Sequence, residues 1–216
     1  MKEKYIYVIL SSTHCRVGSF IRLVTRNKYN HASISLDPDF KKLYSFARYH
    51  QDAPLYAGFT EESPLRYKNN YKYAGIKIYK IPVTKKQYNN TKKHIKKMEK
   101  CSKKYVYNFL SAATFPFRKK IKIKESYTCI EFALQILEEI NIIDKNKFYS
   151  FKDLENKLKK YLMFEGTSNE VFNTNADWGN DKFLEKKGRV FNYIILLEIL
   201  ILLKRLIFRF SIDKND

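Results

Sequence analysis

The segment HASISL at residues 31–36 alternates strictly between polar and apolar side chains. In an extended chain this spacing places His31, Ser33 and Ser35 on one face and their apolar neighbours on the other. A helix would scatter these residues around its surface. The alternation therefore predicts a β-strand with one polar and one apolar face, and it makes a sheet part of the expected fold.

Other segments extend this sheet and add helices to it. Strands are predicted at residues 5–10, 42–49 and 73–83, the second of them returning from a turn at 37–40. The Pro- and Gly-containing stretch from 52 to 64 is typical of a loop, the aromatic stretch 107–117 of an irregular connection, and 118–124 of a basic loop or edge strand. Helical spacing is found at 17–24, 84–105, 129–140 and 151–162. Strands and helices in this order, without an internal repeat, predict a single α+β domain at residues 1–188.

The chain is strongly basic. Its 42 Lys and Arg against 22 Asp and Glu give a net charge of +20, which favours an acidic partner such as nucleic acid or anionic lipid head groups. The abundance of Lys, Asn and Ile is also what an AT-rich genome produces, so both explanations stay open. The predicted helix at 84–105 carries nine lysines and one glutamate. Its lysines form either an ordinary solvated face or a face that binds anions. No helix-turn-helix or ribonucleoprotein aromatic motif is present, which makes nucleic acid the less favoured partner.

The three cysteines, Cys15, Cys101 and Cys129, show no short-range pairing. This argues against a disulfide framework and against a structural zinc site. The first fifteen residues contain too short an apolar run for a signal peptide. A cytoplasmic location is therefore expected.

Residues 189–216 are predicted to form a C-terminal helix and a polar tail outside the domain. Residues 189–210 are almost continuously apolar, and Glu198, Arg205 and Arg209 fall within about 40° of one another on a helix. The uninterrupted apolar length is short of the roughly 20 residues that a transmembrane helix needs. Two interpretations remain: a helix lying on the inner face of an anionic membrane, or a helix packed on the domain or on a partner subunit.

Cys129 is placed at the start of a predicted helix. Thr128 and Glu131 have the Thr-x-x-Glu spacing of a capping box, so Thr128 is the expected N-cap and Cys129 the first helical residue. The free amides and the positive dipole end of the first turn favour a thiolate there, and the same amides can stabilise an oxyanion. A buried structural cysteine is the alternative.

A thiol nucleophile needs a base, and the chain has four histidines: His14, His31, His50 and His94. His94 lies in the lysine-rich helix, where the positive field disfavours an imidazolium, and His14 and His50 are in loops or at strand ends. His31 begins a strand and has small serines on its own face, which makes it the best-placed general base.

The segments YNHASISLD, LYSFAR and SYTCIEFALQIL together resemble the circularly permuted branch of the NlpC-type papain-like cysteine hydrolases, which includes relatives of lecithin:retinol acyltransferase. In that branch the histidine strand precedes the cysteine helix. The resemblance covers roughly residues 5 to 140. It implies a papain-like antiparallel sheet packed against the cysteine-bearing helix.

The resemblance also implies the chemistry. Cys129 would attack an amide, ester or thioester carbonyl with His31 as its base, as a hydrolase (amidase or peptidase) or an acyltransferase, without metal or cofactor. The family places a polar residue on the next strand to orient the histidine, and there Ser45 is the nearest candidate, with Tyr44 as another. Because neither is the family's usual residue type, a catalytically inactive, membrane-attached binding protein remains an alternative.

Overall fold

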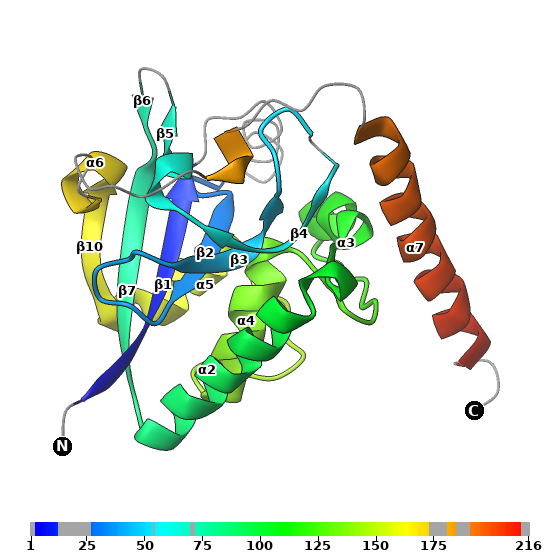
Figure 1. The fold of residues 1–216 in the computed structure, drawn as a ribbon. Coiled ribbons are helices and arrows are strands. Elements are labelled where there is room, and N and C mark those ends of the chain that lie inside the picture. Colours follow the sequence, from blue (N-terminus) through cyan, green and yellow to red (C-terminus); the bar gives the residue numbers. More distant parts are fainter. Residues whose placement is uncertain are drawn as a thin grey trace.

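The computed structural model describes residues 3–12, 27–53, 55–69, 72–172, 181–184 and 191–212. His14, Cys15 and the helix predicted at 17–24 lie outside these residues. The described chain is an α+β structure with one mixed eight-stranded sheet and helices packed against it (Figure 1). The α+β prediction is therefore confirmed.

The sheet is built around the N-terminal strand β1 (Lys4–Ser12), which pairs antiparallel with β2 (His31–Ser35) and with β7 (Gly75–Val83). Beyond β2 follow β3 (Leu43–Arg48), β4 (Ala57–Glu62), β8 (Val106–Tyr107) and β9 (Ser126–Tyr127), and beyond β7 lies β10 (Leu162–Thr167). All neighbours are antiparallel except β8 and β9, which run parallel. A separate two-stranded ribbon consists of β5 (Lys68–Asn69) and β6 (Lys72–Tyr73).

The helices are α2 (Lys85–Lys100), α3 (Phe109–Thr114), α4 (Cys129–Glu139), α5 (Phe151–Leu158), α6 (Ser168–Val171) and α7 (Phe191–Ile212). Short 3₁₀ turns are η1 (Pro64–Tyr67), η2 (Ser102–Lys104), η3 (Phe115–Phe117), η4 (Lys159–Tyr161) and η5 (Lys182–Leu184). Helices α2 and α4 lie on the same side of the sheet, and α7 lies at the far end from β10 (Figure 1).

The alternation in β2 gives the two faces of the sheet different surroundings. Ala32 and Ile34 pack in the main core together with Phe132 and Leu137 of α4. A second, smaller hydrophobic core is formed by a separate set of buried side chains, which includes Ile9, Phe40, Leu43, Tyr67, Ile76 and Phe172. The predicted strand at 31–36 and its polar and apolar faces are thus confirmed, and so are the strands at 5–10, 42–49 and 73–83.

The loop predicted between 52 and 64 is wrong, because residues 57–62 form β4 in the sheet. Gly58 explains how this strand fits: a Cβ there would come within 2.4 Å of the Tyr105 carbonyl oxygen and 2.3 Å of the Tyr49 hydroxyl. The glycine that suggested a loop is therefore needed for close packing of a strand. The aromatic stretch predicted to be irregular contains α3, and β10 was not predicted.

Helix α7 matches the helix predicted at 189–210. Among the described residues, no helix is long and apolar enough to cross a membrane. The side chains of Glu198 and Arg209, which the predicted polar stripe included, lie outside the described part of the chain.

Candidate active site

Cys129 is the first residue of α4, as the capping box predicts. The Thr128 hydroxyl accepts a hydrogen bond from the Glu131 amide at 3.3 Å, and the Glu131 carboxylate accepts one from the Thr128 amide at 2.8 Å. Both bonds fix the beginning of the helix. The Cys129 thiol is free and buried, with 5% of the residue exposed.

The start of α4 is also held from the side. The Ser111 hydroxyl of α3 donates to the second oxygen of Glu131, in a buried contact. Glu131 therefore accepts from two donors, and these contacts fix the first turn of α4, which begins with Cys129.

His31 is the first residue of β2 and lies close enough to Cys129 to interact with it. A side-chain hydrogen bond with the Cys129 thiol is among the causes that raise the pKa of His31. Its Nε2 atom lies 3.0 Å from Oε1 and 3.1 Å from Oε2 of Glu62, at the end of β4. The three side chains come from three elements that are far apart in the sequence, and they form one continuous chain of contacts.

Glu62 is buried in a polar environment. Its Oε2 accepts hydrogen bonds from the Ser33 hydroxyl at 2.8 Å and from the Tyr67 hydroxyl at 2.9 Å. Ser33 and Tyr67 also contact each other at 2.9 Å, and the Arg66 guanidinium lies 3.9 Å from Oε1. A buried carboxylate needs such partners, because its desolvation would otherwise neutralise it.

These contacts shift the proton affinities of the pair in opposite directions. Burial alone would lower the pKa of His31, but the Glu62 charge and the hydrogen bonds to Cys129 and Glu62 raise it above its ordinary value. Burial would raise the pKa of Glu62, but the charge and hydrogen bond of His31, followed by Arg66 and Ser33, lower it. At neutral pH the site therefore holds an imidazolium facing a carboxylate.

Tyr67 remains a hydrogen-bond donor in this network. Burial and then the neighbouring Glu62 charge raise the pKa of Tyr67 well above its ordinary value. The phenol therefore stays protonated over the whole range in which the protein would work.

Arg66 is itself held by Asp181. The guanidinium donates from Nε at 2.7 Å and from Nη2 at 2.9 Å to the two carboxylate oxygens, a bidentate pair in which both side chains are less than a tenth exposed. The ring of Phe183 lies 4.7 Å from the Arg66 guanidinium carbon. This segment therefore fixes Arg66 in a position where its Nη1 lies 3.9 Å from Glu62 Oε1.

The sequence-predicted orienting residue, Ser45, is not the partner of His31. Its hydroxyl is fully buried and, within the described chain, makes no hydrogen bond. Tyr44, the other candidate, packs in the main core on the opposite face of β3. The carboxylate beside the His31 imidazole belongs to Glu62 instead, one strand further along the sheet. The sequence does not indicate it, because its Pro- and Gly-containing segment predicts a loop where β4 lies.

The remaining described histidines lie elsewhere. His94 of α2 is ion-paired with Glu139 at 2.8 Å, and His50 is buried beside Tyr56. Within the described residues, no three His, Cys, Asp or Glu side chains are grouped so that they could hold a metal ion.

No family model, curated protein or solved structure matches this chain. The description of its fold and candidate site therefore comes from its own sequence and structure.

Proposed function

We propose that the protein is a thiol-dependent hydrolase or acyltransferase that attacks an amide, ester or thioester carbonyl through Cys129. The observation that carries the proposal is the chain of contacts from the Cys129 thiol through His31 to the buried Glu62 carboxylate. A nucleophile, a base and a group that orients the base form the arrangement common to such catalysts on unrelated folds.

In the proposed reaction the His31 imidazolium carries the proton that Cys129 has given up, so the nucleophile is the thiolate of a thiolate–imidazolium pair. Because Nε2 faces Glu62, Nδ1 is the ring nitrogen that exchanges this proton. The thiolate sulfur adds to the carbonyl carbon, and the negative charge moves to the carbonyl oxygen. Free amides at the start of α4 supply hydrogen-bond donors and the positive end of the helix dipole for this oxyanion.

Collapse of the tetrahedral intermediate breaks the bond to the leaving group, which takes the proton from His31. The product is a thioester on Cys129. His31 then accepts a proton from water or from another acceptor, whose oxygen or nitrogen attacks the thioester and releases the thiol. Hydrolysis and acyl transfer differ only in this second nucleophile.

Glu62 has a defined part in this cycle. Its carboxylate fixes the orientation of the imidazole and stabilises the imidazolium that forms when Cys129 loses its proton. A serine such as Ser45 could orient the imidazole but could not stabilise its charge. The contact with Glu62 therefore supports an active site more strongly than a contact with Ser45 would.

The order of the elements supports a permuted papain-like fold as part of the same proposal. The histidine strand β2 precedes α4 in the chain, and α4 packs against β2 and the neighbouring antiparallel strand β3. This is the order and packing that the sequence resemblance implies.

The proposal is tested by alkylation with iodoacetamide, followed by mass mapping of each cysteine between pH 5 and 8. We expect Cys129 to react first, and His31→Gln to slow its reaction roughly 100-fold, because the thiolate loses its stabilising imidazolium. The matched control is Cys101→Ser, which removes the other described free thiol and should leave the Cys129 rate unchanged.

An activated p-nitrophenyl ester distinguishes a catalyst from an inactive binding domain. Intact-mass measurement should detect an acyl adduct that is absent from Cys129→Ala. A Cys129 alkylation rate that does not respond to His31→Gln, or an adduct that survives Cys129→Ala, would overturn the proposal.

A further inference from the structure

Helix α7 has one face that is bound to the domain. Leu202 is buried against Val106 and Ile123, and Ile201 and Leu206 flank this contact. Arg205 lies on the same side of the helix and donates to the carbonyl oxygens of Lys104 and Lys124, both at 3.0 Å. The position of α7 against the domain is thus fixed by an apolar contact and by charge-assisted hydrogen bonds.

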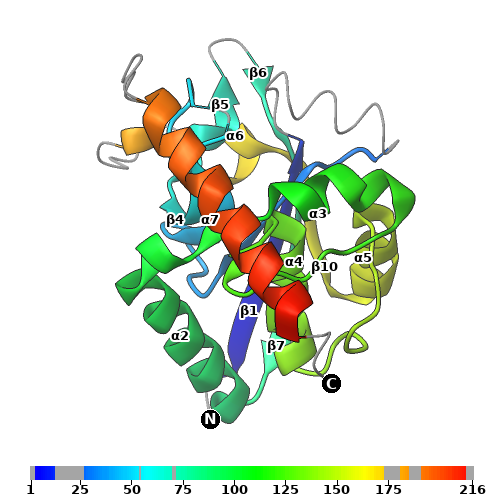
Figure 2. The same ribbon diagram turned by 90° about the vertical axis from the view of Figure 1, so that its right-hand side faces the viewer.

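The opposite face of α7 is apolar and exposed. At 100° per residue, Leu196, Leu200, Leu203 and Ile207 fall within about 60° of one another. Their exposed fractions are 54%, 52%, 43% and 65%, and Leu197 and Phe208 widen the same surface. We call these six residues the outer face of α7. Figure 2, in which α7 crosses the front of the molecule, shows that none of the other labelled helices and strands covers this face.

One cation lies within this apolar arc. Lys204 is exposed, and its Nζ lies 6.0 Å from the centre of the Phe208 ring. A lysine stem along an apolar surface, with its charge carried to the edge, is typical of helices at a lipid–water boundary.

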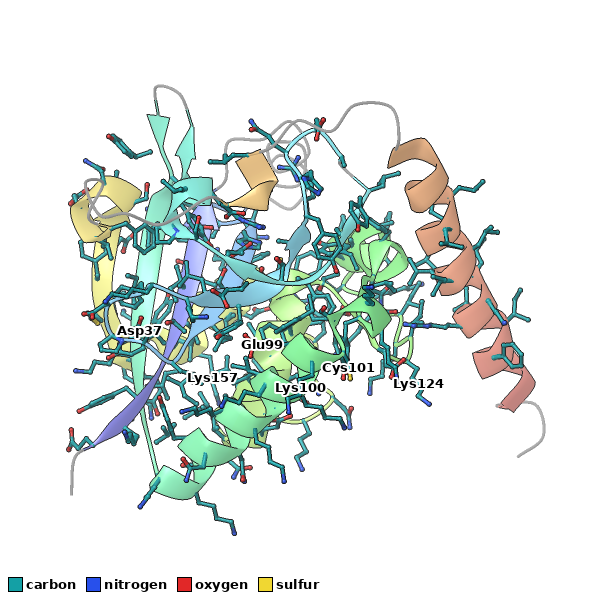
Figure 3. All side chains as sticks on the ribbon, viewed as in Figure 1. Asp37, Glu99, Lys100, Cys101, Lys124 and Lys157 are labelled. Atoms are coloured by element: carbon teal, nitrogen blue, oxygen red, sulfur yellow. The ribbon has the colours of Figure 1, made fainter. Side chains whose placement is uncertain are left out.

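The domain surface beside α7 is basic. Arg205 contacts the backbone carbonyls of Lys104 and Lys124, so these two exposed lysines and the neighbouring exposed Lys103 belong to the surface beside the C-terminal half of α7. Figure 3 shows Lys124 at this edge, next to α7. The nearby acid Glu125 is paired with Arg205 at 3.6 Å, which cancels its charge.

We propose that the outer face of α7 and these lysines form a docking surface for an anionic phospholipid bilayer. The leucine, isoleucine and phenylalanine side chains enter the boundary between head groups and acyl chains, and the lysines bind the phosphates. This inference does not depend on the chemistry of Cys129.

A second copy of the chain is a poorer occupant of this surface. Joining two outer faces would bring two sets of flanking lysines together in chains that each carry a net charge of +20. Like charges repel at this range, whereas an anionic bilayer neutralises them.

The test uses the full chain and sedimentation with vesicles of phosphatidylglycerol and phosphatidylcholine. We expect binding to the mixed anionic vesicles, and at least about tenfold weaker binding to pure phosphatidylcholine or at high salt. The double variant Leu200→Glu/Ile207→Glu should reduce binding to anionic vesicles at least about tenfold, because two charges would have to enter the boundary.

The matched control is Leu162→Glu, which changes an exposed leucine on β10, at the other end of the sheet. It should bind as the wild type does. The thermal unfolding of all variants shows whether they are folded, since an exposed substitution should leave it nearly unchanged.

Four results would overturn the proposal. The first is the absence of binding to anionic vesicles, and the second is equal binding by the double variant. The third is a stable dimer that the double variant dissociates. The fourth is retention on RNA or duplex DNA at about 150 mM salt by a protein that does not bind vesicles.

Discussion

Two histidine–glutamate pairs of nearly equal length lie in different parts of this molecule. His31 and Glu62 are 3.0 Å apart beneath the start of α4, and His94 and Glu139 are 2.8 Å apart where α2 meets the end of α4. The side chains of the first pair are 13% and 3% exposed, and those of the second are 21% and 37% exposed. Distance does not separate the two pairs, but burial does.

The surroundings of the two carboxylates differ as well. Glu62 also accepts hydrogen bonds from Ser33 and Tyr67 and has Arg66 within 3.9 Å. Glu139 is the last residue of its helix and is partly in solvent. A buried charge with fixed partners changes the chemistry of the histidine beside it, whereas an exposed pair chiefly links two helices.

Removing one carboxylate from each pair should give the largest contrast. Glu62→Gln leaves the His31 imidazolium without its buried counter-charge, so we expect a loss of about 3 kcal/mol in the free energy of unfolding. The alkylation rate of Cys129 should fall roughly 100-fold. Glu139→Gln should cost less than about 0.5 kcal/mol, because the pair that it breaks is partly screened by water.

Urea unfolding gives both free energies, and alkylation under native conditions gives the rate even where Glu62→Gln is marginally stable. Equal losses for the two variants would show that burial does not separate the pairs.

The buried pair should also give the folded protein a distinctive pH dependence. The pKa of His31 is raised from 6.5 to about 10, so between these values the folded chain binds more protons than the unfolded one. Its contribution to stability is complete below pH 6.5 and is lost as the pH rises. The pKa of Glu62 is lowered to about 2, so its contribution is lost at the acidic end instead.

The free energy of unfolding of the wild type should therefore fall between pH 7 and 9, relative to the double variant His31→Gln/Glu62→Gln. The difference should change by up to about 1.4 kcal/mol per pH unit. Parallel curves for the two proteins would mean that His31 binds no extra proton in the folded state.

The sequence predicts the part of this site around Cys129 more fully than the part around Glu62. Around Cys129, local signals agree: Thr128 and Glu131 form the expected capping box, and the apolar residues of α4 face the core. The alternation in 31–36 likewise places His31 and Ser33 together on one face. These features depend on neighbours within one element, which is why periodicity reveals them.

Glu62 could not be found in this way. It comes directly after another glutamate, in a segment whose strand character depends on pairing with β3 and on the close approach of Gly58 to Tyr105. Glu61 and Glu62 look alike in the sequence, yet the first is paired on the surface with Lys42 and the second is buried. The pairing of β4 with β3 sets Glu62 opposite Leu43 and Glu61 opposite Tyr44, so the two carboxylates lie on opposite faces of the sheet.

The smallest predicted effect concerns Asp181, which holds Arg66 beside the buried pair. In Asp181→Asn the guanidinium loses its bidentate partner and becomes free to pair with Glu62, in competition with His31. We expect the alkylation rate of Cys129 at neutral pH to fall about threefold to tenfold, with the free energy of unfolding lower by about 1 to 2 kcal/mol.

If Asp181 acts only on stability, the pH–rate profile of Cys129 alkylation should keep its shape in Asp181→Asn. If Arg66 competes for Glu62, the alkaline limb of the profile should move to lower pH, because the His31 imidazolium loses part of its counter-charge. Lys42→Gln is the matched control: it breaks an exposed pair with Glu61, the residue next to Glu62, and should leave both the profile and the stability nearly unchanged. If Asp181→Asn and Lys42→Gln give the same profile, Arg66 does not act on the pair, and the contrast between the two histidines rests on Glu62 and its hydroxyl donors alone.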